Sequence, residues 1–204
     1  MKYALKNAVI LDGTKDMEPL RGQSVLVEGE TIVGLAPAGS EPMGFEPVDL
    51  TGKYLMPGLF NMHVHLAGSG KPQKKQRDNE KLVKTIMGSG LTRAVAYSMV
   101  RGFARDELMS GVTTIRTMGG LGNFDSRLRD EIAAERQDGP RILAANQGIS
   151  VPCGHMAGSV AIAARSIDEA LAHLEQSERE GVDLVKLMIR AYSAGSNATP
   201  SFWS

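Results

Sequence analysis

Short apolar runs separated by turn residues dominate the first part of the chain. They predict strands over residues 3–11, 24–27, 31–35 and 48–50. Glu28-Gly29-Glu30 lies between the second and third runs, which is typical of a β-hairpin with a short glycine-containing loop. We therefore expect residues 1–56 to form a small β-sandwich-like strip that is too thin to bury a sizeable core by itself.

From Leu59 onward the pattern alternates between strand and helix. Runs rich in β-branched and apolar residues predict strands over residues 59–66, 112–115, 142–145 and 183–189. Apolar positions at helical spacing, with a capping box at Ser166 and Glu169, predict helices over residues 93–110, 126–136 and 166–181. This alternation indicates an α/β fold in which helical crossovers join parallel strands.

Four strand–helix units fit into residues 57–189. A complete (β/α)8 barrel of the TIM type needs about 250 residues, or about 31 per unit. We therefore expect the first four βα units of such a barrel, truncated, with a small open sheet as the alternative. Residues 190–204 lack periodicity and are rich in small polar side chains, so we expect a disordered or non-native tail.

Composition narrows the classes of protein to which the chain can belong. Lys+Arg and Asp+Glu both number 23, and this zero net charge argues against binding to nucleic acid or to an acidic membrane surface. The single cysteine, Cys153, excludes an internal disulfide. We find no signal-peptide pattern and no apolar run near the ~18 residues of a membrane span, so we expect a cytoplasmic protein.

His63 and His65 are the most informative polar residues in the sequence. On a strand, side chains two positions apart project to the same face about 7 Å apart, so both imidazoles should point to one side. At the C-terminal end of a barrel strand, such a pair would face the active-site mouth and could share a divalent metal, with Zn²⁺ expected. The alternative is a pair of histidines with other partners on a half-buried strand.

Two further residues are candidates for the same site. Lys186 lies among the apolar residues of the predicted strand 183–189, which indicates a strand buried on both faces. A lysine there must pair, lose its proton or be modified, although most strand-end lysines simply reach solvent. His155 follows the third predicted strand, in a loop where a barrel places substrate-contacting groups; the alternative is a loop histidine without such a function.

The residues around the histidine pair resemble a known family. The segment Pro57-Gly58-Leu59-Phe60-Asn61-Met62-His63-Val64-His65 resembles the metal-site strand of the amidohydrolase superfamily. The segment Gly111-Val112-Thr113-Thr114-Ile115-Arg116-Thr117-Met118-Gly119-Gly120 resembles the second barrel strand of its imidazolonepropionase-like and Xaa-Pro-dipeptidase-like branch. Two matches in the right order are more specific than either alone, and the resemblance covers nearly everything up to residue 189.

This resemblance implies a hydrolase that cleaves amide, peptide or cyclic amide C–N bonds of a small-molecule or dipeptide-like substrate. It implies one or two divalent metal ions and a metal-activated water. His63 and His65 would be the first metal ligands, Lys186 a possible carboxylated lysine that bridges two metals, and His155 a substrate-binding residue. The family's other ligands and its general base come from later strands. The chain could therefore be an incomplete fragment that needs a C-terminal half or associates with itself.

Two positions depart from the pattern of this family. Asn61 stands where relatives usually have an aspartate, and this removes a carboxylate that could orient a ligand histidine. Thr117 stands where an aspartate usually follows the arginine at position 116. Neither change removes an expected metal ligand.

Overall fold

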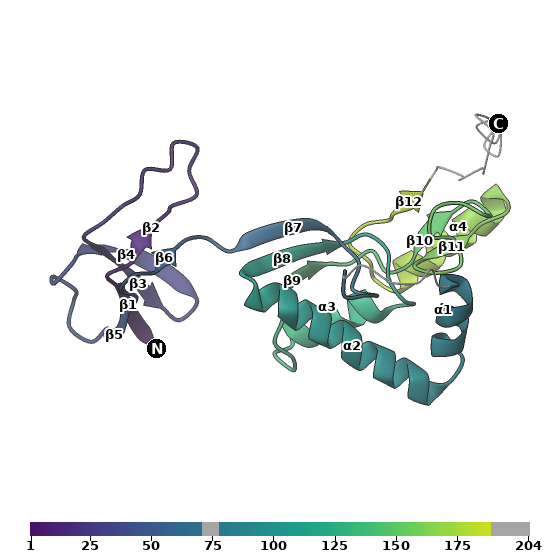
Figure 1. The fold of residues 1–204 in the computed structure, drawn as a ribbon, viewed down its shortest axis with the longest axis horizontal. Coiled ribbons are helices and arrows are strands. Elements are labelled where there is room, and N and C mark those ends of the chain that lie inside the picture. The colour runs from purple at the N-terminus through teal and green to yellow at the C-terminus, as the bar shows by residue number, and fades with distance from the viewer. Residues whose placement is uncertain (71–77, 189–204) are drawn as a thin grey trace. The chain divides into compact units, whose positions relative to one another are not determined.

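The chain divides into two compact units, Met1–Gly58 and Leu59–Ser204, which we call the N-terminal unit and the βα unit. A computed structural model describes residues 1–70 and 78–188 of these units (Figure 1). The predicted tail, residues 190–204, lies outside the described residues. No helix in the described ranges combines the length and the hydropathy that crossing a membrane requires.

The N-terminal unit contains a four-stranded sheet and a separate pair of strands. The sheet has the order β4-β3-β1-β5, and β2 pairs with β6. These strands are β1 (Lys2–Lys6), β2 (Val9–Ile10), β3 (Gln23–Glu28), β4 (Thr31–Pro37), β5 (Glu46–Asp49) and β6 (Tyr54–Leu55). Strands β3 and β4 form the predicted antiparallel hairpin, with Gly29 at a φ of 60° in its turn. A small core of Ala4, Leu26 and Ala36, with Phe45 packed against it, lies in this sheet.

Asn7 divides the predicted strand over residues 3–11 into β1 and β2. It has a φ of 63°, a left-handed conformation that asparagine adopts more readily than most residues. Its side-chain amide donates a hydrogen bond to Asp49 over 2.8 Å, which holds the kink in place. The chain therefore leaves the four-stranded sheet after Lys6 and continues into the β2–β6 pair.

Residues 59–70 and 78–188 of the βα unit form two three-stranded parallel sheets. The first has the order β7-β8-β9 and the second the order β11-β10-β12. Their strands are β7 (Leu59–Val64), β8 (Val112–Thr117), β9 (Arg141–Leu143), β10 (Gly148–Ser150), β11 (Ala161–Ala163) and β12 (Leu187–Met188). The backbone N–H of Asp183 donates to the carbonyl of Ala144 over 2.8 Å, so pairing continues from the end of β9 toward β12.

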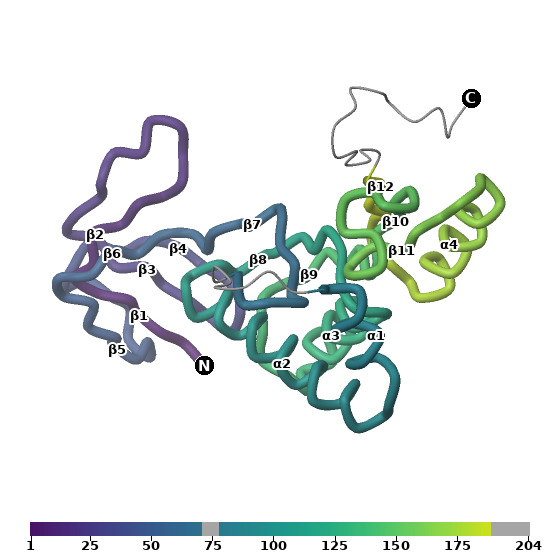
Figure 2. The backbone as a smooth tube through the Cα atoms, turned by 45° about the vertical axis from the view of Figure 1, so that its right-hand side comes forward, coloured from purple at the N-terminus to yellow at the C-terminus, as the bar shows by residue number. Residues whose placement is uncertain are grey.

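The described part of the βα unit has four helices: α1 (Asn79–Met87), α2 (Gly90–Met109), α3 (Phe124–Ala133) and α4 (Ile167–Arg179). Helices α2 and α3 lie on one face of the first sheet, and α4 lies beside the second sheet (Figures 1 and 2). The core between α2, α3 and the first sheet includes Val100, Ile115 and Leu128, all 2% exposed or less. Helix α4 begins at its predicted cap, where the Ser166 hydroxyl accepts from the backbone N–H of Glu169.

Several elements differ from the sequence-based expectations. Helix α1 is missing from those expectations, although its Asp78 cap and the apolar residues Leu82, Val83 and Ile86 at helical spacing give a local signal for it. Strands β10 and β11 have three residues each, which is too short for periodicity to show. The sequence predicts a strand over 183–189, but β12 begins only at Leu187. The Asp183 carboxylate accepts from the backbone N–H of Ala144 and pairs with Arg129, which ties down the start of this segment outside the strand ladder.

Candidate metal centre

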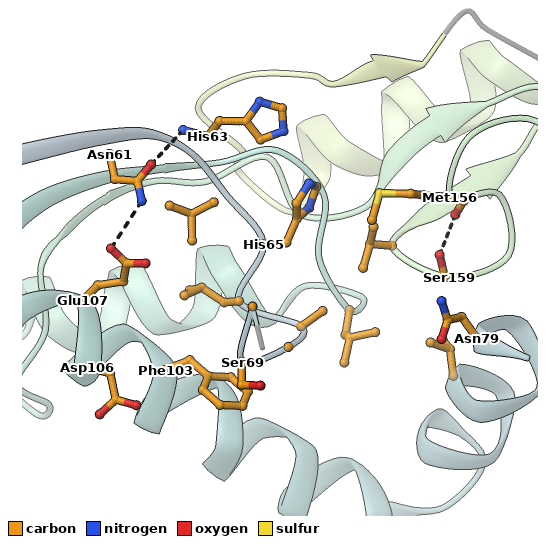
Figure 3. A pocket seen from close by; sticks show the side chains of 18 of the residues that line it. Asn61, His63, His65, Ser69, Asn79, Phe103, Asp106, Glu107, Met156 and Ser159 are labelled. Carbon is orange, nitrogen blue, oxygen red and sulfur yellow. Dashed lines mark hydrogen bonds between the residues drawn. The ribbon is translucent and has the colours of Figure 1, made fainter. Parts of the chain in front are cut away.

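A β-bulge in β7 sets the directions of the two histidines. The register with β8 shifts between Asn61, which pairs with Ile115, and Val64. Because Ile115 and Val64 are both buried in the core beneath the helices, Asn61 also faces the helix side. His63 and His65 share the other side of the strand, as the sequence predicts. Their ring centroids lie 5.3 Å apart with an interplanar angle of 63° (Figure 3).

The ring of His65 is fixed by one backbone group. Its Nδ1 atom lies 2.9 Å from the carbonyl oxygen of Gly119, and the residue is half-buried. A carbonyl can only accept, so this hydrogen bond places the proton of the neutral ring on Nδ1. The Nε2 atom then carries the lone pair that an imidazole offers to a metal ion.

His63 is more exposed than His65, yet its environment favours the neutral ring. Partial desolvation is the largest cause of its lowered pKa, followed by electrostatic effects of His65, Lys186 and Arg116. Arg116 donates from Nε to the carbonyl of Met62 over 2.9 Å, which holds the guanidinium beside the bulge. A histidine with a lowered pKa is neutral at neutral pH, and the neutral ring is the form that binds metals.

Lys186 is close enough to His63 for its charge to act on that ring, but its surroundings differ from those expected. Its carbonyl accepts from the backbone N–H of Ile149 over 2.8 Å, and its side-chain stem lies against Gly148. The residue is half-buried and the next residue, Leu187, is 60% exposed. The expected burial on both faces is therefore wrong: in the described part of the chain, β12 buries Met188 on one face and leaves Leu187 uncovered on the other.

His155 lies in the exposed loop between β10 and β11. Met156 from the same loop lines the cavity beside the histidine pair, whereas His155 is not among the lining residues. Within residues 1–70 and 78–188, no three His, Cys, Asp or Glu side chains are arranged to hold a metal ion. In this part of the chain, His155 therefore does not complete a three-ligand site with His63 and His65.

A cavity of about 680 Å³ opens beside the two histidines, between β7, α1, α2 and the loop before β11 (Figure 3). On its wall, the Asn61 amide donates to Glu107 over 3.4 Å, and its oxygen accepts from the backbone N–H of His63 over 3.4 Å. Asn61 thus holds the strand backbone at the bulge. It does not orient an imidazole ring, which is the function that the sequence suggests for a carboxylate at this position.

A buried acid near His65 is not singled out by any sequence motif. Asp125, in the first turn of α3, is 1% exposed. Burial raises its pKa to about 6, against the opposing effect of a hydrogen bond from Thr117. The hydroxyl of Thr117 also accepts from the backbone N–H of Ala145 over 3.0 Å. The residue that departs from the family pattern therefore both donates and accepts a hydrogen bond through its side chain. An acidic residue in a first helical turn usually indicates only a favourable helix dipole, which is why the sequence gives no further signal.

The sequence of this chain is similar to that of known proteins. The sequence profile of the Amidohydrolase family matches residues 54–198, which includes part of the segment expected to be a non-native tail. An imidazolonepropionase from Paenarthrobacter aurescens is 26% identical over 166 residues, which cover 79% of this chain and 36% of that protein. The chain therefore spans little more than a third of this curated relative.

Solved structures share the fold. A protein assigned as a prolidase from Bifidobacterium longum has a TM-score of 0.70 and 31% identity, covering 94% of this chain and 41% of that one. A Xaa-Pro dipeptidase with methionine bound in its active site has a TM-score of 0.70 and 23% identity, covering 94% of this chain and 48% of that one. The family profile matches well over half of the residues, so the resemblance carried by the two motifs is confirmed and the chain belongs to the amidohydrolase family.

Proposed function

We propose that this chain contributes the first metal ligands of an enzyme that hydrolyses amide, peptide or cyclic amide C–N bonds with a metal-activated water. The observation that carries the proposal is the histidine pair on β7, with ring centroids 5.3 Å apart on one side of the strand. Family membership supports the reaction class. The substrate would be a small molecule or a dipeptide-like compound, and one or two divalent ions, with Zn²⁺ expected, would act as cofactor.

The chemistry of the donor set fits a divalent cation. The contact between His65 Nδ1 and the carbonyl of Gly119 leaves Nε2 free to donate its lone pair, and the lowered pKa of His63 favours a second neutral imidazole. A divalent cation bound there would polarise a carbonyl group and lower the pKa of water toward 7. His63 and His65 would hold it, and the cavity beside them would receive the substrate.

Lys186 and His155 are the two further assignments that we propose for this site. Lys186 lies near His63 and, as a carboxylated lysine, would supply a bridging oxygen ligand between two metals. His155 would contact substrate from the loop between β10 and β11. Both are proposals from the family resemblance, and the electrostatic effect of Lys186 on His63 supports the first of them.

We further propose that residues 57–189 supply the first four βα units of a (β/α)8 barrel, preceded by a β-strip over residues 1–56 and followed by a tail over 190–204. The partial coverage of the relatives, 41% and 48% of two solved chains, supports this division. The alternative function follows from it. The chain would then be catalytically incomplete until it associates with a C-terminal half or with a second copy. Exposed apolar side chains on β7 and β12, such as Phe60 at 68% and Leu187 at 60%, favour such an association.

The test is an activity assay on the 204-residue chain with Zn²⁺, alone and with a second chain that carries the remaining part of a full-length relative. Substrates would be a dipeptide, a cyclic amide and an N-acyl amino acid. We expect no hydrolysis above background from the chain alone, because no three ligand side chains among the described residues are arranged to hold the metal that would activate water. We expect metal-dependent turnover with the second chain present.

The matched variants are His63→Ala in β7 and His173→Ala in α4, the helix beside the second sheet (Figure 1). Turnover should disappear with the first change and persist with the second. Hydrolysis by the chain alone that depends on His63 would reject the incomplete-fragment alternative and support the enzyme. Absence of hydrolysis in the two-chain mixture, with both chains folded and Zn²⁺ present, would count against the proposed function itself.

A further inference from the structure

Asp125 is a buried acid with an unsatisfied oxygen. It is 1% exposed, and its Oδ2 atom has no hydrogen-bond partner among the described residues. The Thr117 hydroxyl is its hydrogen-bonding side chain. A buried carboxyl oxygen without a hydrogen bond costs free energy in the folded state, so its presence needs an explanation. Its neighbours indicate what that explanation is.

The carboxyl group of Asp125 packs directly against the backbone of Gly120. A Cβ atom built on Gly120 would lie 2.5 Å from Oδ2 and 2.9 Å from Oδ1, so no larger residue fits there while Asp125 keeps its position. On the other side of this turn, a Cβ atom on Gly119 would lie 3.1 Å from the carbonyl oxygen of Val160 and 3.4 Å from Cε1 of His65. The Gly119-Gly120 turn is thus enclosed by Asp125 on one side and by Val160 and His65 on the other.

The same turn carries the carbonyl group that orients His65. The oxygen of Gly119 lies 2.9 Å from His65 Nδ1, and Gly119 has a φ of 133°, which only glycine adopts readily. A shift of the turn by a few tenths of an ångström would lengthen and bend this hydrogen bond, which weakens steeply with poor geometry. Contacts therefore run without interruption from Asp125 through Gly120 and Gly119 to the imidazole.

We propose that Asp125 is a positioning residue: its carboxyl group supports the Gly119-Gly120 turn and thereby holds His65 in the Nδ1-protonated tautomer with Nε2 free. The proposal rests on the proposed function only in taking Nε2 as the metal-binding atom. Asp125 acts on the ring through the turn. Gly120 has no side chain where the Asp125 carboxyl packs. The role can therefore be tested by adding a methyl group at position 120 and removing the carboxyl group at position 125.

The first experiment measures the tautomer of His65 in the metal-free, full-length chain. The ¹⁵N shifts of its ring nitrogens at pH 8 give the ratio of the Nδ1–H to the Nε2–H form. Gly120→Ala should lower this ratio by about fivefold, the factor that corresponds to a net hydrogen-bond contribution of about 1 kcal/mol. Asp125→Ala should lower it similarly. The double variant should return to within about twofold of the wild-type ratio, because the new methyl group occupies space that the carboxyl group leaves.

Gly102→Ala is the matched control, since Gly102 lies in α2 and an added Cβ there meets no atom within 4 Å. It should leave the ratio unchanged. If Gly120→Ala does not fold, Asp125→Asn and Asp125→Ala decide the question: the amide fills the same space and should keep the ratio, while alanine should lower it. Folded variants with the wild-type ratio in Asp125→Ala, or with no rescue in the double variant, would overturn the proposal.

A second measurement separates this proposal from the proposed function. Zn²⁺ affinity of the same chains should fall about tenfold in Asp125→Ala, as is usual when support for a ligand histidine is lost, and stay near wild type in Asp125→Asn. If the wild-type chain binds no Zn²⁺, the proposed metal site fails. The tautomer ratios would still decide whether Asp125 positions His65.

Discussion

Replacing Asp125 by asparagine should change how the stability of the βα unit depends on pH. Burial raises the pKa of this carboxyl from an ordinary value of 3.8 to about 6 in the folded chain. One pKa unit corresponds to about 1.36 kcal/mol, so the shift of roughly two units amounts to about 3 kcal/mol. The side chain is 1% exposed, and screening by solvent therefore reduces this figure little.

The sign follows from the two protonation equilibria. Below about pH 4 the carboxyl is protonated in both states, and its burial then adds no ionic penalty. Between about pH 4 and pH 6 the unfolded chain ionises while the folded chain keeps its proton, so the free energy of unfolding falls as the pH rises. Above pH 6 both states are ionised and the full penalty applies. Asparagine carries no such proton, and the variant should lose this part of the pH dependence.

Urea unfolding at pH 4 and pH 8, followed by ellipticity at 222 nm, measures the effect, because α1 to α4 all lie in the βα unit. The difference in free energy of unfolding between Asp125→Asn and wild type should move by about 2 kcal/mol in favour of the variant at pH 8, less than the full effect because the unfolded carboxyl is already partly ionised at pH 4. Asp106→Asn, an exposed carboxyl in α2, is the matched control and should show a much smaller change. A change below about 1 kcal/mol for Asp125→Asn would refute the reasoning, since the folded protein would then tolerate the ionised form.

Further predictions concern the histidine pair and its neighbours. Purified chain should retain Zn²⁺ weakly, and elemental analysis should find none in the His63→Ala, His65→Ala double variant; equal metal in both would exclude this site. Lys186 should be a free amine in the chain alone, because the described residues do not complete a second metal site, and a carboxyl mass increment would contradict this. Asn61→Asp should lower stability by about 1 kcal/mol, measured by thermal unfolding, because it faces Glu107, and adding Glu107→Gln should restore it.

Local sequence signals predicted several elements that carry their own periodicity or caps. Strand β8 has buried positions at the expected spacing, and α4 begins at the Ser166 cap. Helix α2 forms where the spacing of Val95, Met99 and Phe103 predicts it, but Val95 and Met99 are more than half exposed, and the helix instead buries Ala96, Val100 and Ala104. Strands β10 and β11 were not predictable in this way, because partners distant in sequence stabilise them. Strand β10, for example, owes its pairing to β11 and to β12, the latter almost 40 positions later. Helix α1 has a cap at Asp78 and apolar residues at helical spacing, so local signals for it exist although the sequence-based expectations leave it out.

Only the part of the candidate site that depends on local spacing in the sequence was predictable. Two histidines at i and i+2 share a side wherever the strand is regular, and the bulge between Asn61 and Val64 leaves His63 and His65 on one side, so they could be identified together. The support for His65 depends on the Gly119-Gly120 turn and on Asp125, which lie over 50 positions away in the chain and meet it only in the folded structure. No motif of local spacing contains that information.

The β-bulge alters the interpretation of Asn61. In a regular strand, Asn61 would share a side with His63 and His65, and an aspartate there could receive a hydrogen bond from an imidazole. The bulge instead turns Asn61 toward Glu107, where an amide can donate and a carboxylate could only repel. Asn61, in place of the family's aspartate, therefore suits the carboxylate of Glu107 opposite it. It affects how the strand is anchored at His63, while the tautomer of His65 depends on the separate turn supported by Asp125.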